Sequence, residues 1–312
     1  MKKIFFLAAL ALVFSACTQS DPRFSQGLEA AQAGHFDTAD SLFTSVLKDD
    51  PGNHAAWNNR AFVRLRAGHD SLALPDAGEA IRLDSSEHVY YEVRAAIYLD
   101  RDRFEEADAD IRKALELAPR SAQAYFLRGT LYFHQKTYDK AIKSLKKSIE
   151  LDPSQLESRI QLIAVYANAG QYEKAVYEAT RMLDQGIIDP VLLLNRGYAA
   201  MNLGKYDLAE GDFEKALQLN PELAEARNNL GFLRFLGGKS REGRKLIEES
   251  IKLKRENALA YAFRALIFQS EGKKDSACAD LFHARALGLN FEDFPEWKFR
   301  ETFNEECINN QP

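Results

Sequence analysis

The sequence predicts an all-helical solenoid built from eight helix–turn–helix units of 34 residues each. A small residue returns every 34 positions without an insertion, at Ala39, Ala73, Ala107, Ala141, Ala175, Ala209, Gly243 and Ala277. A second small residue and a glycine recur at the same interval, in the first helical stretch and in the turn after it. A unit of this length buries its apolar face only by stacking on its neighbours, so the product is an extended surface.

Composition agrees with a folded protein that is neither disordered nor a multi-span membrane protein. The 312 residues are 46% hydrophobic and 28% charged, which is ordinary for a globular chain. Length alone would predict about two domains. The unbroken register instead predicts one elongated array, in which each unit contacts only its neighbours.

Residues 1–16 have the parts of a bacterial export signal: Lys2 and Lys3, an apolar run, and small residues before Cys17. The apolar run is too short to span a bilayer. Ser15-Ala16-Cys17 resembles the lipobox of bacterial lipoproteins, although Phe14 stands where that family prefers Leu or Val. We expect Cys17 to be the lipidated first residue of the mature chain and residues 17–21 to form a short tether. Plain secretion, with Cys17 lost or free, is the alternative.

Charge argues against nucleic acid or an anionic lipid surface as the main partner. Removal of Lys2 and Lys3 with the signal leaves 39 basic and 46 acidic residues, a net charge of −7. Binding to phosphates needs concentrated positive charge. We therefore expect lipid, and not charge, to hold the chain to a membrane.

The solenoid is expected over residues 22–290, with repeats that start near 20, 54, 88, 122, 156, 190, 224 and 258. Asp21 and Pro22 suit the cap and first position of the first helix. The eighth place of each repeat is small in seven units, with Ile163 the exception, and we expect it to contact the recurring small residue of the second helix. The fifteenth place is glycine in six units, where the chain needs a left-handed residue.

These repeats resemble the tetratricopeptide repeat. In one unit Tyr125, Gly129, Tyr132, Ala141, Leu145 and Pro153 occupy the signature places of that family. The resemblance covers residues from about 20 to 290. It implies a right-handed superhelix whose first helices line a concave groove, and a groove that holds peptides or partner proteins.

The places that the family turns inward supply the candidate binding residues. They combine apolar anchors with amides that suit an extended or helical peptide. The candidates are Asn58, Phe62, Phe126, Phe133, Asn168, Tyr198, Met201, Asn202, Asn228, Phe232 and Phe235. Packing between repeats is the alternative role for any one of them.

No motif points to catalysis, a cofactor or a metal. His35 and His69, like His54 and His88, are one repeat apart, which at about 10 Å of helix spacing is too far for two ligands of one ion. There is no phosphate-binding glycine loop and no Cys-x-x-Cys pair. The sequence therefore predicts a protein that is not an enzyme.

The end of the chain, residues 291–312, is expected to be a capping helix and tail. Pro295 suits a first turn, and Phe299, Phe303 and Cys307 recur every four residues. A covering helix would hide the apolar flank that the last repeat exposes. Export favours oxidation, so Cys278 and Cys307 are predicted to form a disulfide, with two free buried thiols as the alternative.

Together these patterns predict a non-enzymatic scaffold in the bacterial envelope that binds a protein or peptide in its concave groove. Because Thr18 follows Cys17, where the lipoprotein family uses Asp for retention in the inner membrane, we expect the outer membrane. The alternative is a structural lipoprotein that associates with itself. Concentration-dependent oligomers of the delipidated chain would favour that alternative. The sequence names no partner and leaves the oligomeric state and the leaflet open.

Overall fold

The computed structural model describes residues 21–293, 301 and 303–308. These residues form sixteen α-helices and no β-strand, which confirms the predicted all-helical class. The chain divides into two compact units, residues 1–165 and 166–312, and each is described by itself. The signal segment and Cys17 lie outside the described residues.

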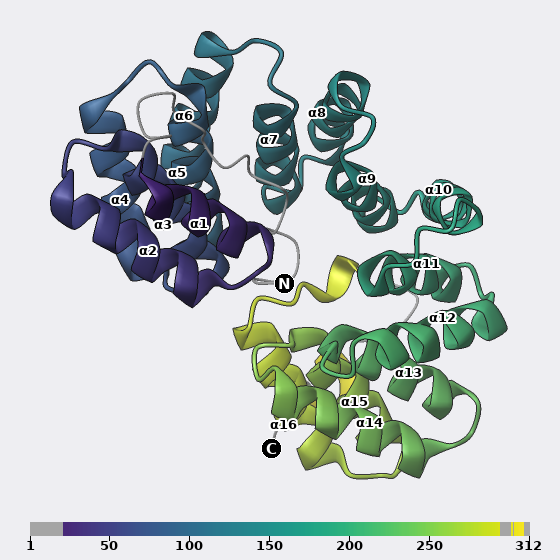
Figure 1. Ribbon diagram of the computed structural model, residues 1–312. Helices are drawn as coiled ribbons and strands as arrows, with labels where there is room; N and C mark the ends of the chain where they lie inside the picture. The colour runs from purple at the N-terminus through teal and green to yellow at the C-terminus, as the bar shows by residue number, and fades with distance from the viewer. Residues whose placement is uncertain (1–20, 294–300, 302, 309–312) are drawn as a thin grey trace. The chain divides into compact units, whose positions relative to one another are not determined.

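In the first unit eight helices form four hairpins, drawn from purple to teal in Figure 1. They are α1 (Pro22–Gln32), α2 (Phe36–Asp49), α3 (His54–Arg66), α4 (Asp70–Leu83), α5 (His88–Asp100), α6 (Phe104–Leu117), α7 (Ala122–His134) and α8 (Tyr138–Leu151). The boundary between the units falls inside α9 (Leu156–Asn168).

The second unit continues the same pattern of paired helices and ends in two short elements. Its α-helices are α10 (Tyr172–Asp184), α11 (Pro190–Asn202), α12 (Tyr206–Leu219), α13 (Ala224–Leu236), α14 (Ser240–Leu253), α15 (Ala258–Ser270) and α16 (Lys274–Ala286). The two short elements are a 3-10 helix, η1 (Phe291–Asp293), and a π-helix, η3 (Phe303–Ile308). We call the odd-numbered α-helices first helices and the even-numbered ones second helices.

The 34-residue register is visible in the helix starts. From α3 onward the first helices begin at residues 54, 88, 122, 156, 190, 224 and 258. The turn within each hairpin needs one left-handed residue. Glycine supplies it in six hairpins, and Asp102 and Lys136 take the same conformation, each with φ 55°, in the other two.

Stacking of hairpins builds the core of each unit. In the first unit second helices pack on the first helices that follow them: α2 on α3, α4 on α5 and α6 on α7. First helices also contact one another directly, α1 with α3, α3 with α5 and α5 with α7. In the second unit α11, α13 and α15 make the same contacts. Each unit therefore carries a row of adjacent first helices.

The recurring small residues lie at the centre of the hairpins. The seven alanines of this set are fully buried, and Gly243 is buried too. In several units the nearest neighbour of the eighth place is a large side chain of the second helix, which the sequence analysis did not predict. A Cβ added at Gly129 would lie 2.6 Å from Leu145 Cγ, and one at Gly197 would lie 2.7 Å from Phe213 Cε1. The eighth place is small because a large side chain four positions after the recurring small residue packs onto it.

Repeat seven is the exception, because there the two helix backbones meet. A Cβ on Gly243 would fall on the carbonyl oxygen of Gly231 and lie 3.0 Å from the backbone nitrogen of Phe235. Backbone atoms cannot rotate away as a side chain can. Gly243 is thus glycine because α13 and α14 approach more closely than alanine permits.

We expect Gly243→Ala to destabilise the second unit by about 1–3 kcal/mol, although alanine favours helix and occupies this place in seven repeats. Gly211→Ala is the matched control, since Gly211 lies inside α12 with nothing within 4 Å of an added Cβ. That control is expected to stabilise by about 0.5–1 kcal/mol. Urea unfolding followed by circular dichroism measures both. Equal gains in the two variants would contradict the close approach.

The structure can be compared with the predictions for the cap of the first helix and for part of the tail. Asp21 caps α1 by accepting a hydrogen bond from the backbone nitrogen of Arg23, and Pro22 takes the first helical position. In the tail, Phe303 and Cys307 are buried, and Cys307 forms a disulfide with Cys278 of α16. Pro295 and Phe299 lie outside the described residues, so the predicted start of a tail helix is not tested.

Candidate functional site

The eleven candidate groove residues differ widely in exposure. Asn58, Phe62, Phe126, Met201, Asn228 and Phe232 are at most 5% exposed, and Phe133 is 9% exposed. Tyr198, Asn202 and Phe235 are half-buried, and Asn168 is exposed. The buried members cannot touch a partner in this conformation. The surface that the first helices offer is therefore smaller than the inward-facing places predict.

Aromatic packing explains the burial of Phe232. Its ring is stacked on that of Phe263 with centroids 3.9 Å apart, and Phe235 lies 6.1 Å away. Phe263 belongs to α15, so this stack joins the first helices of repeats seven and eight. Phe232 holds the repeats together, and Phe235 marks the edge of the stack that remains partly open.

On α11 the half-buried pair Tyr198 and Asn202 lie one turn apart. The Asn202 side-chain nitrogen donates to the Tyr198 carbonyl oxygen at 2.8 Å, which fixes the amide. The Asn202 side-chain oxygen is buried and has no hydrogen-bond partner among the described residues. A buried amide oxygen without a donor costs free energy, so this acceptor is an unfavourable feature of the fold in this conformation.

The fifth place of two first helices carries a buried polar side chain that reaches the residue before the next repeat. Glu92 of α5 is 2% exposed and accepts a hydrogen bond from the Ser121 hydroxyl, which also caps α7 through Ala124. In the second unit the amides of Asn228 and Asn257 lie 2.8 Å apart at the same two places. These polar pairs link successive repeats.

Burial raises the pKa of the Glu92 carboxyl to about 7, because desolvation outweighs the stabilising hydrogen bond from Ser121. The nearest basic group is His88 on the same helix, with its Nε2 atom 3.9 Å from the carboxylate. A carboxyl whose pKa is higher in the folded chain than in the unfolded chain stabilises the folded state in full at pH values below its unfolded pKa, which is about 4.5. That contribution is lost as the pH rises through about 7.

We expect Glu92→Gln to remove this pH dependence. The amide oxygen still accepts from Ser121, but nothing ionises, so the variant should gain up to about 3 kcal/mol over the native chain at pH 8 and almost nothing at pH 4. Urea unfolding at both pH values measures the difference. Glu87→Gln, at an exposed carboxyl just before α5, is the control. A native-like pH slope in Glu92→Gln would contradict a buried, proton-binding Glu92.

The repeats also share an arginine–aspartate pair that the sequence analysis missed. Its arginine is at the seventh place of the first helix and its aspartate lies 16 residues later on the second helix. In each pair the arginine Nε atom donates to one carboxylate oxygen and the Nη2 atom donates to the other, at 2.6–2.9 Å. The pairs are Arg60 with Asp76, Arg94 with Asp110, Arg196 with Asp212, and Arg264 with Asp280.

An alignment of the eight repeats would have predicted these pairs from the sequence. When the eight repeats are aligned, arginine at the seventh place accompanies aspartate at the twenty-third in four of them. Where the seventh place is Leu162 or Leu230, the aspartate is replaced by Glu178 or Leu246. Repeat four is an exception, because it keeps the arginine as Arg128 but has Ser144 at the twenty-third place. In the other repeats the aspartate is present only where the arginine is, as expected if each buried charge needs its partner.

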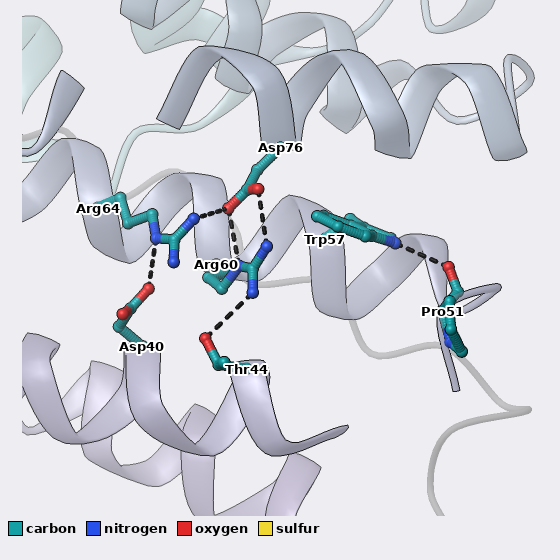
Figure 2. A network of polar contacts seen from close by, with 7 residues as sticks. All are labelled: Asp40, Thr44, Pro51, Trp57, Arg60, Arg64 and Asp76. Carbon is teal, nitrogen blue, oxygen red and sulfur yellow. Dashed lines mark hydrogen bonds and ion pairs between the residues drawn. The ribbon is translucent and has the colours of Figure 1, made fainter. Parts of the chain in front are cut away.

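In the first unit the pair of Arg60 and Asp76 is part of a larger polar network, which Figure 2 shows. Asp76 on α4 accepts from Arg60 and also from Arg64, at 2.7 Å. Arg64 reaches Asp40 on α2, and Arg60 reaches the Thr44 hydroxyl at 3.0 Å. The network lies among α2, α3 and α4, so it ties repeat one to repeat two and is not a binding surface.

Comparison with known proteins agrees with this architecture. Models of the tetratricopeptide repeat match residues 24–88, 93–155 and 190–223. The chain is similar in structure to a chain of the APC/C hetero-tetramer Cut9–Hcn1, with a TM-score of 0.68 and 16% identity over 86% of this chain and 52% of that one. It thus spans about half the length of that protein.

Two further structures share the fold at similarly low identity. Human IFIT1, solved as a dimer with m7Gppp-AAAA, has a TM-score of 0.62 and 16% identity, covering 86% of this chain and 72% of that one. Yeast Tom70 has a TM-score of 0.58 and 19% identity, and the match covers 99% of this chain and 69% of that one. The segments that match the repeat models make up more than half of the sequence and coincide with the stacked hairpins, so the chain belongs to the tetratricopeptide repeat family.

Proposed function

We propose that this protein is a non-enzymatic scaffold of the bacterial envelope that holds a partner's peptide segment against its first helices. Tetratricopeptide repeat proteins generally act as protein-interaction scaffolds. The observation that carries the proposal for this chain is the direct contact between successive first helices within each unit. Such a row presents its partly open side chains, Tyr198, Asn202 and Phe235 among them, along one face.

Membrane attachment is the second part of the proposal and rests on the sequence. Among the described residues no helix is long and apolar enough to cross a membrane. We assign attachment to lipid on Cys17, and the outer membrane as its place. Because α1 already begins at Pro22, a tether of residues 18–20 would reach about 10 Å.

Detergent phase partition of the native chain and Cys17→Ala tests the anchor. The native chain should enter the detergent phase, and the variant should not. Native protein that stays in the aqueous phase would exclude the lipid.

Photo-crosslinking in intact envelopes tests the binding surface. A crosslinking amino acid at Tyr198 or Phe235 is expected to capture a partner protein at higher yield than one at Tyr177. Tyr177 is the matched control because it is 62% exposed on the second helix α10. Equal capture from all three positions would contradict a binding surface on the first helices.

Self-association is the competing function, and exposed apolar side chains favour it. Tyr177 and Ile188 are each 62% exposed in the second unit. Sedimentation of the delipidated protein over a range of concentrations separates the two functions. We expect a monomer throughout, and oligomers that grow with concentration would favour the structural lipoprotein.

A further inference from the structure

The twenty-first and twenty-fifth places of a repeat lie one turn apart on its second helix, and in earlier repeats they bond to the first helix that follows. In α12 these places are Glu210 and Glu214, and both carboxylates pair with Arg234 of α13. In α2 the twenty-first place is Asp40, which pairs with Arg64 of α3. The two places therefore mark the surface on which the next repeat stacks.

In repeat eight the tail takes this surface. The twenty-first and twenty-fifth places of α16 are Cys278 and Phe282. Cys278 forms its disulfide with Cys307, and the Phe282 ring packs edge-on against Phe303, with centroids 4.9 Å apart. Cys307 and Phe303 both belong to η3, so this short element occupies the place at which a first helix stacks in the earlier repeats.

Contacts other than the disulfide also hold η3 against α16. Phe303 is 2% exposed and Cys307 is 3% exposed, whereas Ile308 at the end of η3 is 48% exposed. The guanidinium carbon of Arg285, on α16, lies 5.4 Å from the Phe303 ring centroid, which adds a cation–π contact. The surface of α16 is therefore fitted to the chemistry of this tail.

The first repeat of a second copy is a poorer fit for this surface. In later repeats the seventh and eleventh places of a first helix contact the preceding second helix. On α1 these places are Gln26 and Ala30, which offer neither an aromatic ring nor a thiol. The segment whose chemistry matches α16 is the tail itself, and a second copy carries the same tail.

The chain between η1 and η3 is long enough for the tail to reach another molecule. η1 ends at Asp293 and η3 begins at Phe303, so the two are 303 − 293 = 10 positions apart. That length of extended chain spans about 30 Å, well beyond the spacing of two packed helices. Because an exchanged segment makes the same contacts in either molecule, a tail swap between two copies loses none of them.

We propose that α16 is a docking site for the tail of a second copy of this chain, and that thiol–disulfide exchange converts the monomer into a tail-swapped dimer. In the dimer, Cys307 of each copy bonds to Cys278 of the other, and each Phe303 packs on the Phe282 ring of the other copy. This inference goes beyond the scaffold function and does not depend on it. Without a thiol the protein stays the monomer expected above.

A small monothiol such as glutathione starts the exchange. Its thiolate attacks the sulfur of Cys278, which is half-buried, because that of Cys307 is only 3% exposed. The disulfide breaks, Cys278 is left in a mixed disulfide, and Cys307 leaves as a thiolate. That thiolate attacks Cys278 of the second copy and releases the second Cys307. The released thiolate attacks the mixed disulfide and returns the monothiol, so two bonds within chains become two bonds between chains and no oxidant is consumed.

Isotope mixing tests the exchange directly. Equal amounts of isotopically heavy and light protein, both carrying Cys17→Ala to remove the third thiol, are incubated with glutathione, alkylated and digested. We expect linked peptides that join a heavy Cys278 segment to a light Cys307 segment and the reverse. Their share should rise with protein concentration and vanish without glutathione. Linked peptides that are only heavy–heavy or light–light would overturn the proposal.

Complementary single variants test whether the tail is recognised. In the Cys17→Ala background, Cys278→Ser keeps only Cys307 and Cys307→Ser keeps only Cys278, so an oxidised mixture can restore the bond only between chains. We expect this heterodimer to form severalfold in excess of either homodimer. Equal amounts of all three disulfide-linked pairs would show random collision of thiols and refute docking by the tail.

A second pair of variants separates ring contact from thiol chemistry. Phe303→Ala, placed in the chain that keeps Cys307, should lower the heterodimer yield roughly fivefold or more, because it removes the ring that contacts Phe282 and Arg285. Ile308→Ala is the matched control, since Ile308 is largely exposed on the same element. Equal yields from the two variants would contradict a docking site on α16 and leave the scaffold function standing.

Discussion

Replacement of Asp76 by alanine is expected to destabilise the first unit by about 3–5 kcal/mol, because it leaves the buried Arg60 without a carboxylate and removes one of the two carboxylates that Arg64 contacts. The Asp76 side chain is 4% exposed, and those of Arg60 and Arg64 are 10% and 14% exposed. At such depth the mutual attraction of the charges offsets a large desolvation cost. Removal of one partner leaves that cost unopposed.

Two matched variants test whether the loss of stability in Asp76→Ala comes from the buried network of two arginines. Asp110→Ala removes the equivalent carboxylate of repeat three, where only Arg94 depends on it and is 24% exposed, so a smaller loss is expected. Glu79→Ala breaks the exposed pair with Arg82, whose side chain is 65% exposed, and should cost little because water screens the pair. Urea unfolding ranks the three. A loss in Asp76→Ala no larger than that in Glu79→Ala would show that the network does not stabilise the fold.

Loss of the disulfide is expected to destabilise the second unit by about 3–4 kcal/mol, since Cys278 and Cys307 close a loop across a sequence separation of 29 residues. The bond joins η3 to α16. Beside it Phe303 is 2% exposed and packs edge-on against Phe282, with centroids 4.9 Å apart, and against Phe291 at 5.4 Å. Without the bond, η3 could detach from α16, which would expose the Phe303 ring to water and give the residues after α16 more conformational freedom.

The double variant Cys278→Ser with Cys307→Ser tests this prediction without unpaired thiols. Hydrogen exchange should become faster in α15 and α16 and remain native in α1 to α8, which serve as the internal control. Mass spectrometry of the unreduced native protein provides a separate check. Two thiols that react with an alkylating reagent would show that the bond is absent.

Repeat boundaries were the most predictable feature, and local chemistry explains why. The left-handed glycines, the buried small residues and the Asp21 cap each act within one hairpin, so a single repeat contains all the information. The packing of the eighth place was less predictable. Whether Gly231 faces a side chain or the backbone of Gly243 depends on how closely two helices approach, which periodicity does not specify.

The candidate site was predicted less well than the fold. Asn58, Phe126 and Met201 stand at inward-facing places, yet they are at most 1% exposed. The spacing of residues along a helix reveals which side chains share a face. It does not reveal how much of that face the next repeat buries, so Tyr198 and Phe235 could not be separated from the buried members beforehand.

By itself the sequence determined the helical class, the 34-residue register and the turn positions, because short-range sterics and backbone conformation act inside each repeat. Only the tertiary structure decided which charges are matched. Asp76 serves two arginines while Arg66 has no carboxylate at ion-pair distance in the described chain, although all three arginines lie on α3. The physical reason is that a charge is neutralised by whatever the stacked neighbouring helices bring to it, and that depends on contacts between residues far apart in the chain.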